Sequence, residues 1–447
     1  MSYSRNSSAR SWYGNQQAAD YAPASQAPAA VAGFIAPAHN GVADSNIAPA
    51  IPKYNQIVPQ SVPVNACWNG SQIQIDVIVD KSIGKALNYF VEFDVQYKNT
   101  GAAAGTAYLA SAASLIDHYD ILYNGSVIET IQSPNLFMEG MVMKSDQELK
   151  QHAVVWGIDI TTSSAGNPQP AAVNIPAPVA PATVASTSTI TYYVPLVGCV
   201  PSAELFVAGI KGELRYRFYL AQNPLCGANG FVSSAGTSIS LQNMTLWVEE
   251  ASVGDASFNA LLAQSRSGLN YRTTLRTLWQ KTQPSLTAGQ VQTDILNAFS
   301  NDSAGLLVWC SANTLDNGFY MNRLNLNTLQ LLDAGGATLT RVLNGPLVNN
   351  IITPSVTPVA SNFTNNPNFN LYFISFCSSL ERVNRGARIL GGLKMSAQEQ
   401  ISINITNSPG AAVLENVISF DYCSMRVQNG ELKWARTAGD VPSWAGM

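Results

Sequence analysis

Apolar and polar residues alternate along several stretches of the chain. This period is typical of half-buried β-strands, because successive side chains of a strand point to opposite faces. In the clearest stretch the apolar set consists of Leu87, Tyr89, Val91, Phe93, Val95 and Tyr97. Further strands are expected at residues 72–80, 192–196, 213–220, 239–249, 271–279, 306–310, 324–329, 371–376, 400–405 and 417–427. The pattern therefore predicts a chain built mainly of antiparallel sheet.

The segment Leu115 to Ile131 predicts a β-hairpin. Its sequence is LIDHYDILYNGSVIETI, and Asn124-Gly125 stands between two strand patterns. Both residues tolerate the positive φ that a two-residue hairpin turn requires. Ser133-Pro134 follows directly, and we expect Ser133 to be the N-cap of a short helix with Pro134 at its first position.

The pattern repeats in the second half of the chain. Each half contains an apolar run, a long polar loop (161–190 and 335–368), an aromatic strand and a final strand, which indicates an internal duplication. Between the halves, Asp255 is expected to cap a helix that carries Phe258, Leu261 and Leu262. The fold class predicted is all-β, with two tandem eight-stranded antiparallel jelly rolls, a few short helices and long loops.

The length of 447 residues exceeds what one hydrophobic core usually supports. The expected organisation is a flexible Ala/Pro-rich arm at 1–66, a first jelly roll at 67–252, a helical connector at 253–268, a second jelly roll at 269–436 and a tail at 437–447. The arm is too rich in Ala and Pro to order by itself. It either reaches a neighbouring subunit or a membrane surface, or is simply a tail.

Charged residues make up 12% of the chain and apolar residues 46%. A typical soluble domain is about 25% charged, so low charge favours extensive contact with neighbours over free diffusion. The net charge of −4 comes with scattered Lys and Arg, which predicts no nucleic-acid-binding surface. We find no signal-peptide pattern and no apolar run long enough for a transmembrane helix.

The six cysteines are far apart in the sequence, and none forms a C-x-x-C pair. They are Cys67, Cys199, Cys226, Cys310, Cys377 and Cys423. We expect them to be reduced and mostly buried, which fits assembly in a cytoplasm. An even number leaves one or two disulfides open as the alternative.

Candidate catalytic groups are few. The three histidines, His39, His118 and His152, are badly placed for a shared metal or nucleophile site. Asp117 and Asp120 should point to opposite faces of one strand, with Asp117 on the face of Tyr119, so they do not form a catalytic carboxylate pair.

Other side chains are assigned structural roles. The acids expected to be solvated are Glu139, Asp146, Glu249 and Glu250. Trp309, Trp434 and Trp444 are assigned to the core, an interface or the C-terminal tail. No hydrolase, phosphate-binding or metal motif is found, so the sequence predicts no enzyme and no catalytic, cofactor-binding or metal residues.

Three segments together resemble the double jelly-roll major capsid proteins of adenovirus, tailless internal-membrane bacteriophages and large DNA viruses. They are the hairpin at 115–131 with its following helix, residues 192–196 (YYVPL) and residues 210–217 (IKGELRYR). In architecture the resemblance covers residues 70–435, whereas recognisable local sequence is confined to the first roll.

The resemblance implies a structural protein of an icosahedral virus shell. Two rolls would stand side by side, and three chains would form a pseudo-hexameric homotrimer whose outer towers are the loops 161–190 and 335–368. Implied partners are neighbouring capsomers, minor capsid and vertex proteins, and an internal membrane near the N-terminal arm. The implied location is the virion, after synthesis and assembly in the host cytoplasm.

Two other function classes were weighed. A cellular or secreted β-sandwich binding module, of carbohydrate-binding or surface-layer type, should show a signal peptide and often Asp clusters for Ca²⁺. A jelly-roll enzyme of the cupin type needs a metal set of His and carboxylate ligands, which three dispersed histidines do not supply.

Overall fold

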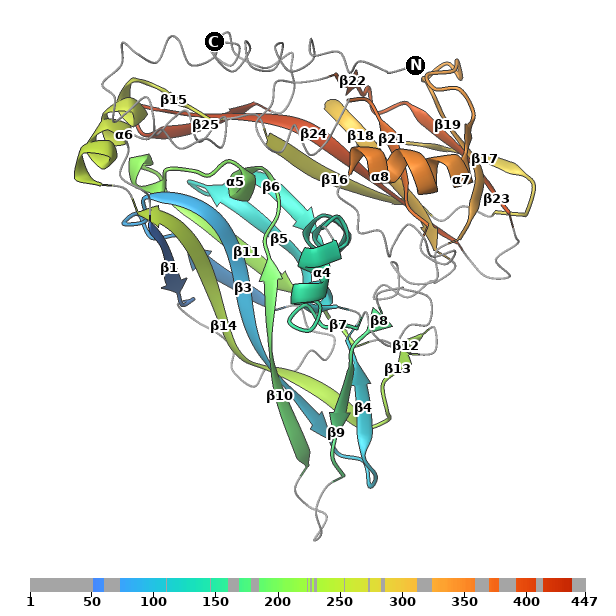
Figure 1. The fold of residues 1–447 in the computed structure, drawn as a ribbon, viewed down its shortest axis with the longest axis horizontal. Coiled ribbons are helices and arrows are strands. Elements are labelled where there is room, and N and C mark those ends of the chain that lie inside the picture. The colour runs from blue at the N-terminus through green and yellow to red at the C-terminus, as the bar shows by residue number, and fades with distance from the viewer. Residues whose placement is uncertain are drawn as a thin grey trace, which may run out of the picture.

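The computed structural model consists of two antiparallel β-sandwiches that follow one another along the chain (Figure 1). It describes residues 51–59, 73–109, 111–144, 146–159, 169–177, 185–222, 224–225, 227–228, 231–252, 254–271, 274–282, 286–311, 324–357, 370–377, 391–406 and 413–435. The expectations for residues 1–50, including His39, and for the tail at 437–447 with Trp444 lie outside these ranges.

The first roll has two four-stranded sheets. Its long sheet has the order β1 (Ile51–Ile57), β14 (Thr237–Ser252), β3 (Lys85–Asn99) and β10 (Ser186–Pro195). Its short sheet has the order β2 (Gln74–Ile78), β11 (Leu214–Leu220), β5 (Ile116–Tyr123) and β6 (Ser126–Gln132). Early and late strands of the chain alternate across the long sheet, and β11 lies between β2 and β5 in the short sheet, which is the wrapping of a jelly roll.

The second roll repeats this order. Its long sheet pairs β16 (Thr274–Thr282), β24 (Leu414–Gln428), β18 (Asp302–Ser311) and β21 (Tyr372–Ser375) in succession. Its short sheet has the order β17 (Val291–Ile295), β23 (Gln400–Ile405), β19 (Leu326–Leu332) and β20 (Leu343–Asn344). The strands occupy the same places in the chain order as those of the first roll, so the predicted double jelly roll is confirmed.

Shorter elements complete the fold. Extra strands extend the second long sheet: β15 (Leu269–Asn270) and β25 (Glu431–Ala435) pair with β24, and β22 (Leu393–Lys394) pairs with β18. Three small ribbons pair β4 (Gly105–Tyr108) with β9 (Ala172–Ile175), β7 (Ile158–Asp159) with β8 (Gln169–Pro170), and β12 (Gly227–Ala228) with β13 (Phe231–Val232).

The helices near the first roll are η2 (Ala112–Leu115), α3 (Ser133–Phe137), η3 (Met138–Val142), α4 (Asp146–His152), α5 (Cys199–Ser202) and η4 (Val207–Gly209). The remaining helices are α6 (Asp255–Ser267), α7 (Gly345–Leu347), η6 (Val348–Ile352) and α8 (Thr353–Val356).

The predicted hairpin is confirmed. β5 and β6 pair across Asn124 and Gly125, whose φ angles of 48° and 79° are both positive, as the turn requires. The helix caps are displaced by one residue: α3 is capped by Gln132 and α6 by Gly254, so Ser133 and Asp255 are the first helical residues. The Ser133 hydroxyl instead donates to the carbonyl of Ala113 at 3.1 Å.

The predicted arm and loops contain regular structure. Strand β1 lies in the segment expected to be unstructured, and pairs with β14 from Ile51↔Ser252 to Ile57↔Leu246. Its order comes from this tertiary pairing, because its own sequence does not alternate. The expected loop 161–190 contains β8, β9 and the start of β10, and the expected loop 335–368 contains β20, α7, η6 and α8. Residues 161–168, 178–184 and 358–368 of these loops lie outside the described ranges.

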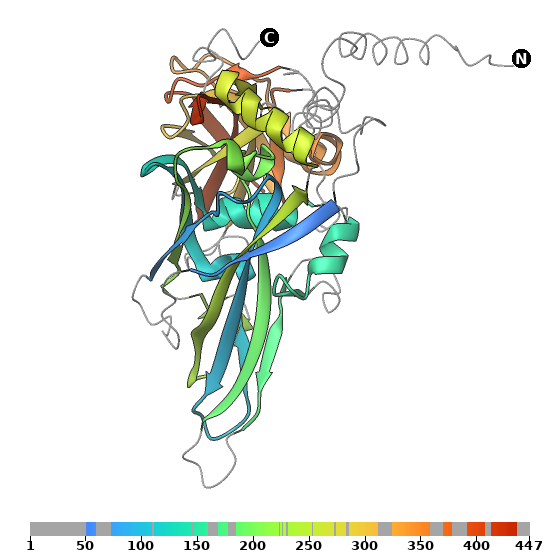
Figure 2. The same cartoon turned by 90° about the vertical axis from the view of Figure 1, so that its left-hand side faces the viewer.

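The hydrophobic core explains why residues 306–310 form a continuous apolar run. Leu306 and Val308 belong to a core inside the second roll, whereas Leu307 and Trp309 belong to the core shared with the first roll. The second roll's long sheet is therefore buried on both faces, and such strands do not alternate in polarity. In Figure 2 the first roll tapers away from the second, which covers its other end.

Candidate functional site

The described histidines do not form a catalytic centre. His118 Nδ1 lies 2.7 Å from Asp117 Oδ2, and its ring stacks on Tyr219 with centroids 4.2 Å apart. His152 Nδ1 donates to the carbonyl oxygen of Glu148 at 2.9 Å. Across the ranges that the structure describes, His, Cys, Asp and Glu form no group of three that could hold a metal ion.

Asp117 does not lie on the face of Tyr119, contrary to the expectation from strand alternation. The register between β5 and β11 shifts, so that Tyr219 pairs with His118 and Leu220 with Ile116. Asp117 is thus the extra residue of a bulge and is exposed, whereas Tyr119 is buried. The other carboxylate, Asp120, accepts a hydrogen bond from Thr130 at 2.6 Å. The bulge leaves the two carboxylates with separate partners.

Two acids expected to be solvated are buried. Glu250 accepts hydrogen bonds from the Gly84 amide at 2.7 Å and the Asn55 side chain at 2.6 Å. Glu139 is partly exposed as a residue, but its Oε2 is buried. Glu249 bonds to exposed Asn88, as expected for a surface acid, and the side chain of Asp146 lies outside what the structure describes. The four described cysteines, Cys199, Cys310, Cys377 and Cys423, are buried and form no disulfide with one another.

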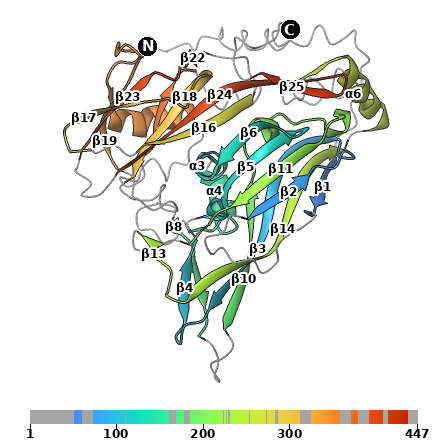
Figure 3. The same cartoon turned by 180° about the vertical axis from the view of Figure 1, so that it is seen from behind.

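The two rolls meet at a joint where β6, α3 and α5 of the first roll lie against β16 of the second (Figure 3). We call this contact the roll–roll joint. Glu129 of β6 is fully buried there, and it accepts hydrogen bonds from the Cys199 amide at 2.7 Å and the Thr277 amide at 3.2 Å. One carboxylate thus satisfies backbone donors of both rolls.

Burial governs the acids of the roll–roll joint. Desolvation raises the pKa of Glu129, although the Cys199 amide and the Arg276 charge oppose this. Desolvation, with the Glu129 charge beside it, raises the pKa of Glu139 to about 8. At neutral pH, Glu139 is therefore mainly protonated. Glu129 and Glu139 thus form part of a structural contact. They do not resemble a general acid and a general base that face an open cleft.

The outer face of the first roll's long sheet carries four partly exposed aromatic residues, which we call the aromatic face: Tyr54, Phe90, Tyr193 and Trp247. Phe90 and Trp247 are paired across β3 and β14, and their rings stack with centroids 6.1 Å apart. Tyr193 meets Phe90 edge-on at 6.0 Å. Rings of this kind are enriched in the centres of protein interfaces.

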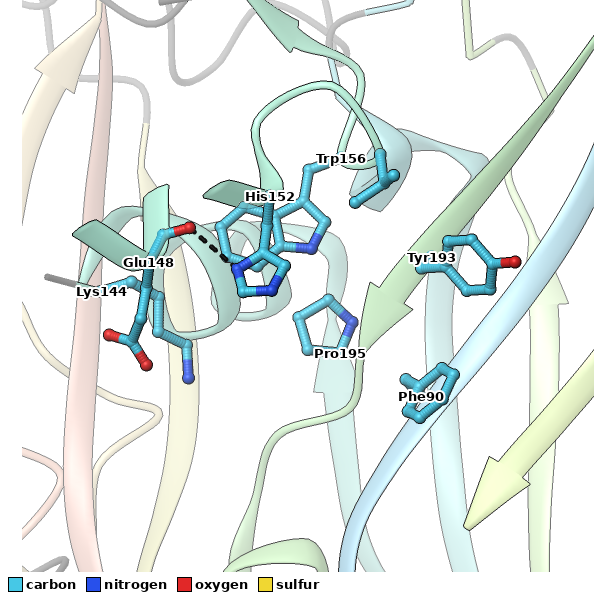
Figure 4. Close-up of a pocket in the computed structure, with 8 residues that line it drawn as sticks. Phe90, Lys144, Glu148, His152, Trp156, Tyr193 and Pro195 are labelled. Atoms are coloured by element: carbon cyan, nitrogen blue, oxygen red, sulfur yellow. Dashed lines mark hydrogen bonds between the residues drawn. The ribbon is translucent and has the colours of Figure 1, made fainter. Parts of the chain in front are cut away.

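A groove with a volume of about 360 Å³ adjoins the aromatic face. Phe90, Tyr193 and Pro195 line its sheet side, and α4 with the following turn lines the other (Figure 4). The residues on that side are Lys144, Glu148, His152, Val155 and Trp156. His152 stacks on Trp156 with centroids 5.2 Å apart, so the floor is largely aromatic. The groove suits apolar contact better than proton transfer.

The aromatic face is not evident in the sequence. Its residues come from four strands that are distant in sequence, and only Tyr193 had been noted, as part of an aromatic strand. One signal was present: Phe90 is an aromatic residue on the otherwise polar side of the stretch 87–98. An apolar ring at a polar position of an alternating strand indicates a covered outer face.

Solved structures of viral capsid proteins share this fold. A PBCV-1 VP54 structure, fitted into a reconstruction of the virophage Sputnik, matches with a TM-score of 0.62 at 13% identity, covering 88% of this chain and 99% of that one. The Faustovirus major capsid protein matches with a TM-score of 0.58 at 10% identity, covering 89% of this chain and 92% of that one. A chain of the Sputnik virophage matches with a TM-score of 0.58 at 10% identity, covering 90% of this chain and 91% of that one.

At such low identity the similarity establishes the double jelly-roll fold. No protein-family model matches the sequence, and no curated protein matches it. None of the helices in the described part of the chain has the length and apolar character that a membrane span requires.

Proposed function

We propose that this chain is a structural major capsid protein of an icosahedral virus shell and that it assembles as a pseudo-hexameric homotrimer. One observation carries the proposal: each chain contains two rolls with the same strand order, and β6 and α3 of the first roll contact β16 of the second. Three such chains supply six similar rolls, so a closed ring of threefold symmetry offers six similar edges to a hexagonal lattice.

The surface supports assembly. Charged residues make up 12% of the chain, and its surface carries an aromatic face and an apolar groove. Burying such a surface between copies of the chain is more favourable than burying the charged surface of a freely diffusing enzyme. We assign it no catalytic activity. Its proposed setting is the virion, in contact with neighbouring capsomers, minor capsid and vertex proteins, and with an internal membrane near the N-terminal arm, after assembly in the host cytoplasm.

The proposed units are the two rolls, with α6 as the connector between them and the first roll extended to include β1. The loops within 161–190 and 335–368 are proposed as tower or trimer contacts. The alternative of a cellular or secreted β-sandwich binding module is not favoured, because the structures matched here are those of viral capsids.

The test is the solution mass of the purified full-length protein by multi-angle light scattering, followed by electron microscopy of the same sample. We expect a species of three times the 47.7 kDa chain mass with a six-lobed outline. A monomer that persists at every concentration up to the solubility limit contradicts the proposal.

A further inference from the structure

The roll–roll joint shows which surfaces of two jelly rolls fit together. The first roll contributes its strand β6 and the helical segment α3–η3 that follows it, and the second contributes β16, the first strand of its long sheet. The outer face of that sheet is closed by this contact: Leu275 and Thr277 of β16 are both buried. The joint is thus a contact of one roll's fifth strand and the following helix with the other roll's first strand.

The second roll has the same helical segment, and there it is exposed. α3 and α7 each follow the fifth strand of their roll and carry a proline in the first turn, Pro134 and Pro346. Aligned on these prolines, fully buried Leu136 corresponds to fully buried Val348, and Glu139 at the joint corresponds to Ile351. Ile351 is 61% exposed and Leu347, one turn earlier, is 39% exposed. Residues four apart share one face of a helix.

The first roll has the matching strand, also exposed. β1 is the first strand of its long sheet, as β16 is of the second. Tyr54 on β1 and Val58 just after it are 58% and 63% exposed. Gln56 pairs with Trp247, so Tyr54 and Val58 lie on the same side of the sheet as the rest of the aromatic face.

One chain cannot bring these two surfaces together. β1 and the α7–α8 region lie at opposite sides of the molecule in Figure 1, and the view from behind in Figure 3 shows β1 far from β17, β19 and β23 of the second roll. A contact between these two surfaces therefore requires a second copy of the chain.

We propose that the α7–η6 segment of one copy packs onto β1 and the aromatic face of a second copy, repeating between chains the joint already formed within each chain. This inference rests on the proposed homotrimer and names its contact. Leu347 and Ile351 meet Tyr54 and Val58, and continued around three copies the contact closes a ring of six rolls.

The charges of both surfaces fit this contact. The segment Gly345–Ile352 has the sequence GPLVNNII and no charged residue. On the receiving face, Glu249 pairs in register with Tyr54 and accepts a hydrogen bond from Asn88. Lys53 lies on the other side of β1, 3.9 Å from Glu250. An uncharged segment therefore brings no like charge toward either acid.

The first experiment compares single substitutions in the full-length protein by light scattering over a dilution series. Ile351→Asp and Tyr54→Asp should each weaken trimer formation about 30-fold or more, because each puts a charge into the contact. Val291→Asp is the matched control: Val291 is 66% exposed, but lies on β17, outside the proposed contact. Far-UV circular dichroism and the melting temperature of the dissociated chains verify that every variant is folded.

The second experiment tests proximity directly. A double variant with Tyr54→Cys and Ile351→Cys, treated with a short bismaleimide, should give covalent species of two and three chains. The single-cysteine variants measure the background from the native cysteines.

The outcomes separate the two proposals. A wild-type trimer that Ile351→Asp and Tyr54→Asp leave intact, with no crosslink specific to the double variant, overturns this contact and leaves the trimer standing. A wild-type protein that is always monomeric overturns the proposed function together with this contact. Dissociation by both variants but not by Val291→Asp, with the specific crosslink, supports it.

Discussion

The two long sheets of the molecule have the same strand order but different surroundings. The second roll's sheet is covered on both faces, and β24 is buried along nearly its whole length. The first roll's sheet is covered on its inner face, whereas its outer face is bordered by α4 and carries half-exposed Phe90, Tyr193 and Trp247. Position in the chain causes the difference: each chain provides one roll–roll joint, and that joint covers the second roll.

The outer face of the second roll's long sheet is buried. Aromatic residues on the equivalent face of the first roll therefore indicate a surface that binds a partner. The other outer face of the first roll, on its short sheet, is polar: Asp76 binds both Arg215 and Arg217 there. A face that contacts water carries paired charges, whereas a face that contacts a partner carries aromatic side chains. The following predictions test this contrast, from the largest effect to the smallest.

The largest effect is expected from removing a ring on the doubly buried sheet. Trp309→Ala should lower the free energy of unfolding by about 3–5 kcal/mol, because the side chain is fully buried between the rolls. Trp247→Ala, on the half-exposed sheet, should cost about 1 kcal/mol in the monomer. Urea denaturation of dissociated chains measures both, and equal costs would show that the two sheets do not differ in this way.

The second prediction concerns the roll–roll joint. Glu129→Ala should cost about 2–4 kcal/mol, since the amides of Cys199 and Thr277 both lose their acceptor in a buried place. Glu129→Gln, which keeps one acceptor oxygen, should cost less. Unfolding curves of the three proteins give the order, and an alanine variant as stable as the glutamine variant would contradict it.

The third prediction is a pH dependence. The pKa of Glu139 is raised from 4.5 to about 8, so the folded protein binds its proton more tightly than the unfolded chain does. This stabilisation is fully present below pH 4.5 and is lost as the pH rises toward 8, by at most about 1.4 kcal/mol per pH unit.

Glu139→Gln has no such proton to lose. Its stability relative to wild type should therefore improve steadily between pH 5 and pH 8, in urea denaturation at several pH values. Glu249→Gln, at an exposed position, is the matched control for the loss of one carboxylate. A Glu139→Gln curve that runs parallel to the wild-type curve would refute the buried proton.

The smallest effect belongs to the polar outer face. Hydrogen bonds from Arg217 and Arg215 lower the pKa of Asp76, but the three side chains are partly solvated. Asp76→Asn should cost about 0.5 kcal/mol, less in high salt, and leave the solution mass unchanged. A loss of the trimer in this variant would mean that the polar face is also an interface.

The sequence was most informative where local chemistry decides the structure. The Asn124-Gly125 hairpin and the strand at 87–98 were predictable, since turn conformation and alternation are encoded by neighbours in the chain. Strand β1 was missed because its partner, β14, lies almost two hundred residues away. The segment α7–η6 lies within the predicted loop 335–368, whose many Asn, Thr and Pro residues do not indicate a helix.

The surfaces that we propose as contacts are harder to predict, because they exist only after folding. The aromatic face is assembled by strand register from four separate strands, and the roll–roll joint from β6, α3, α5 and β16. Glu129 and Glu139 owe part of their surroundings to the second roll, where Thr277 and Arg276 lie close to them.

The doubly buried sheet also has a consequence for synthesis. Every strand of the first roll precedes α6, so the ribosome completes the first roll before it makes β16. Domains usually fold in this order as the chain emerges. The apolar outer side of β24 would be a hazard for aggregation if it stood free. β24 is translated after the first roll, which covers this side of it. The order of translation therefore protects the nascent chain from aggregation.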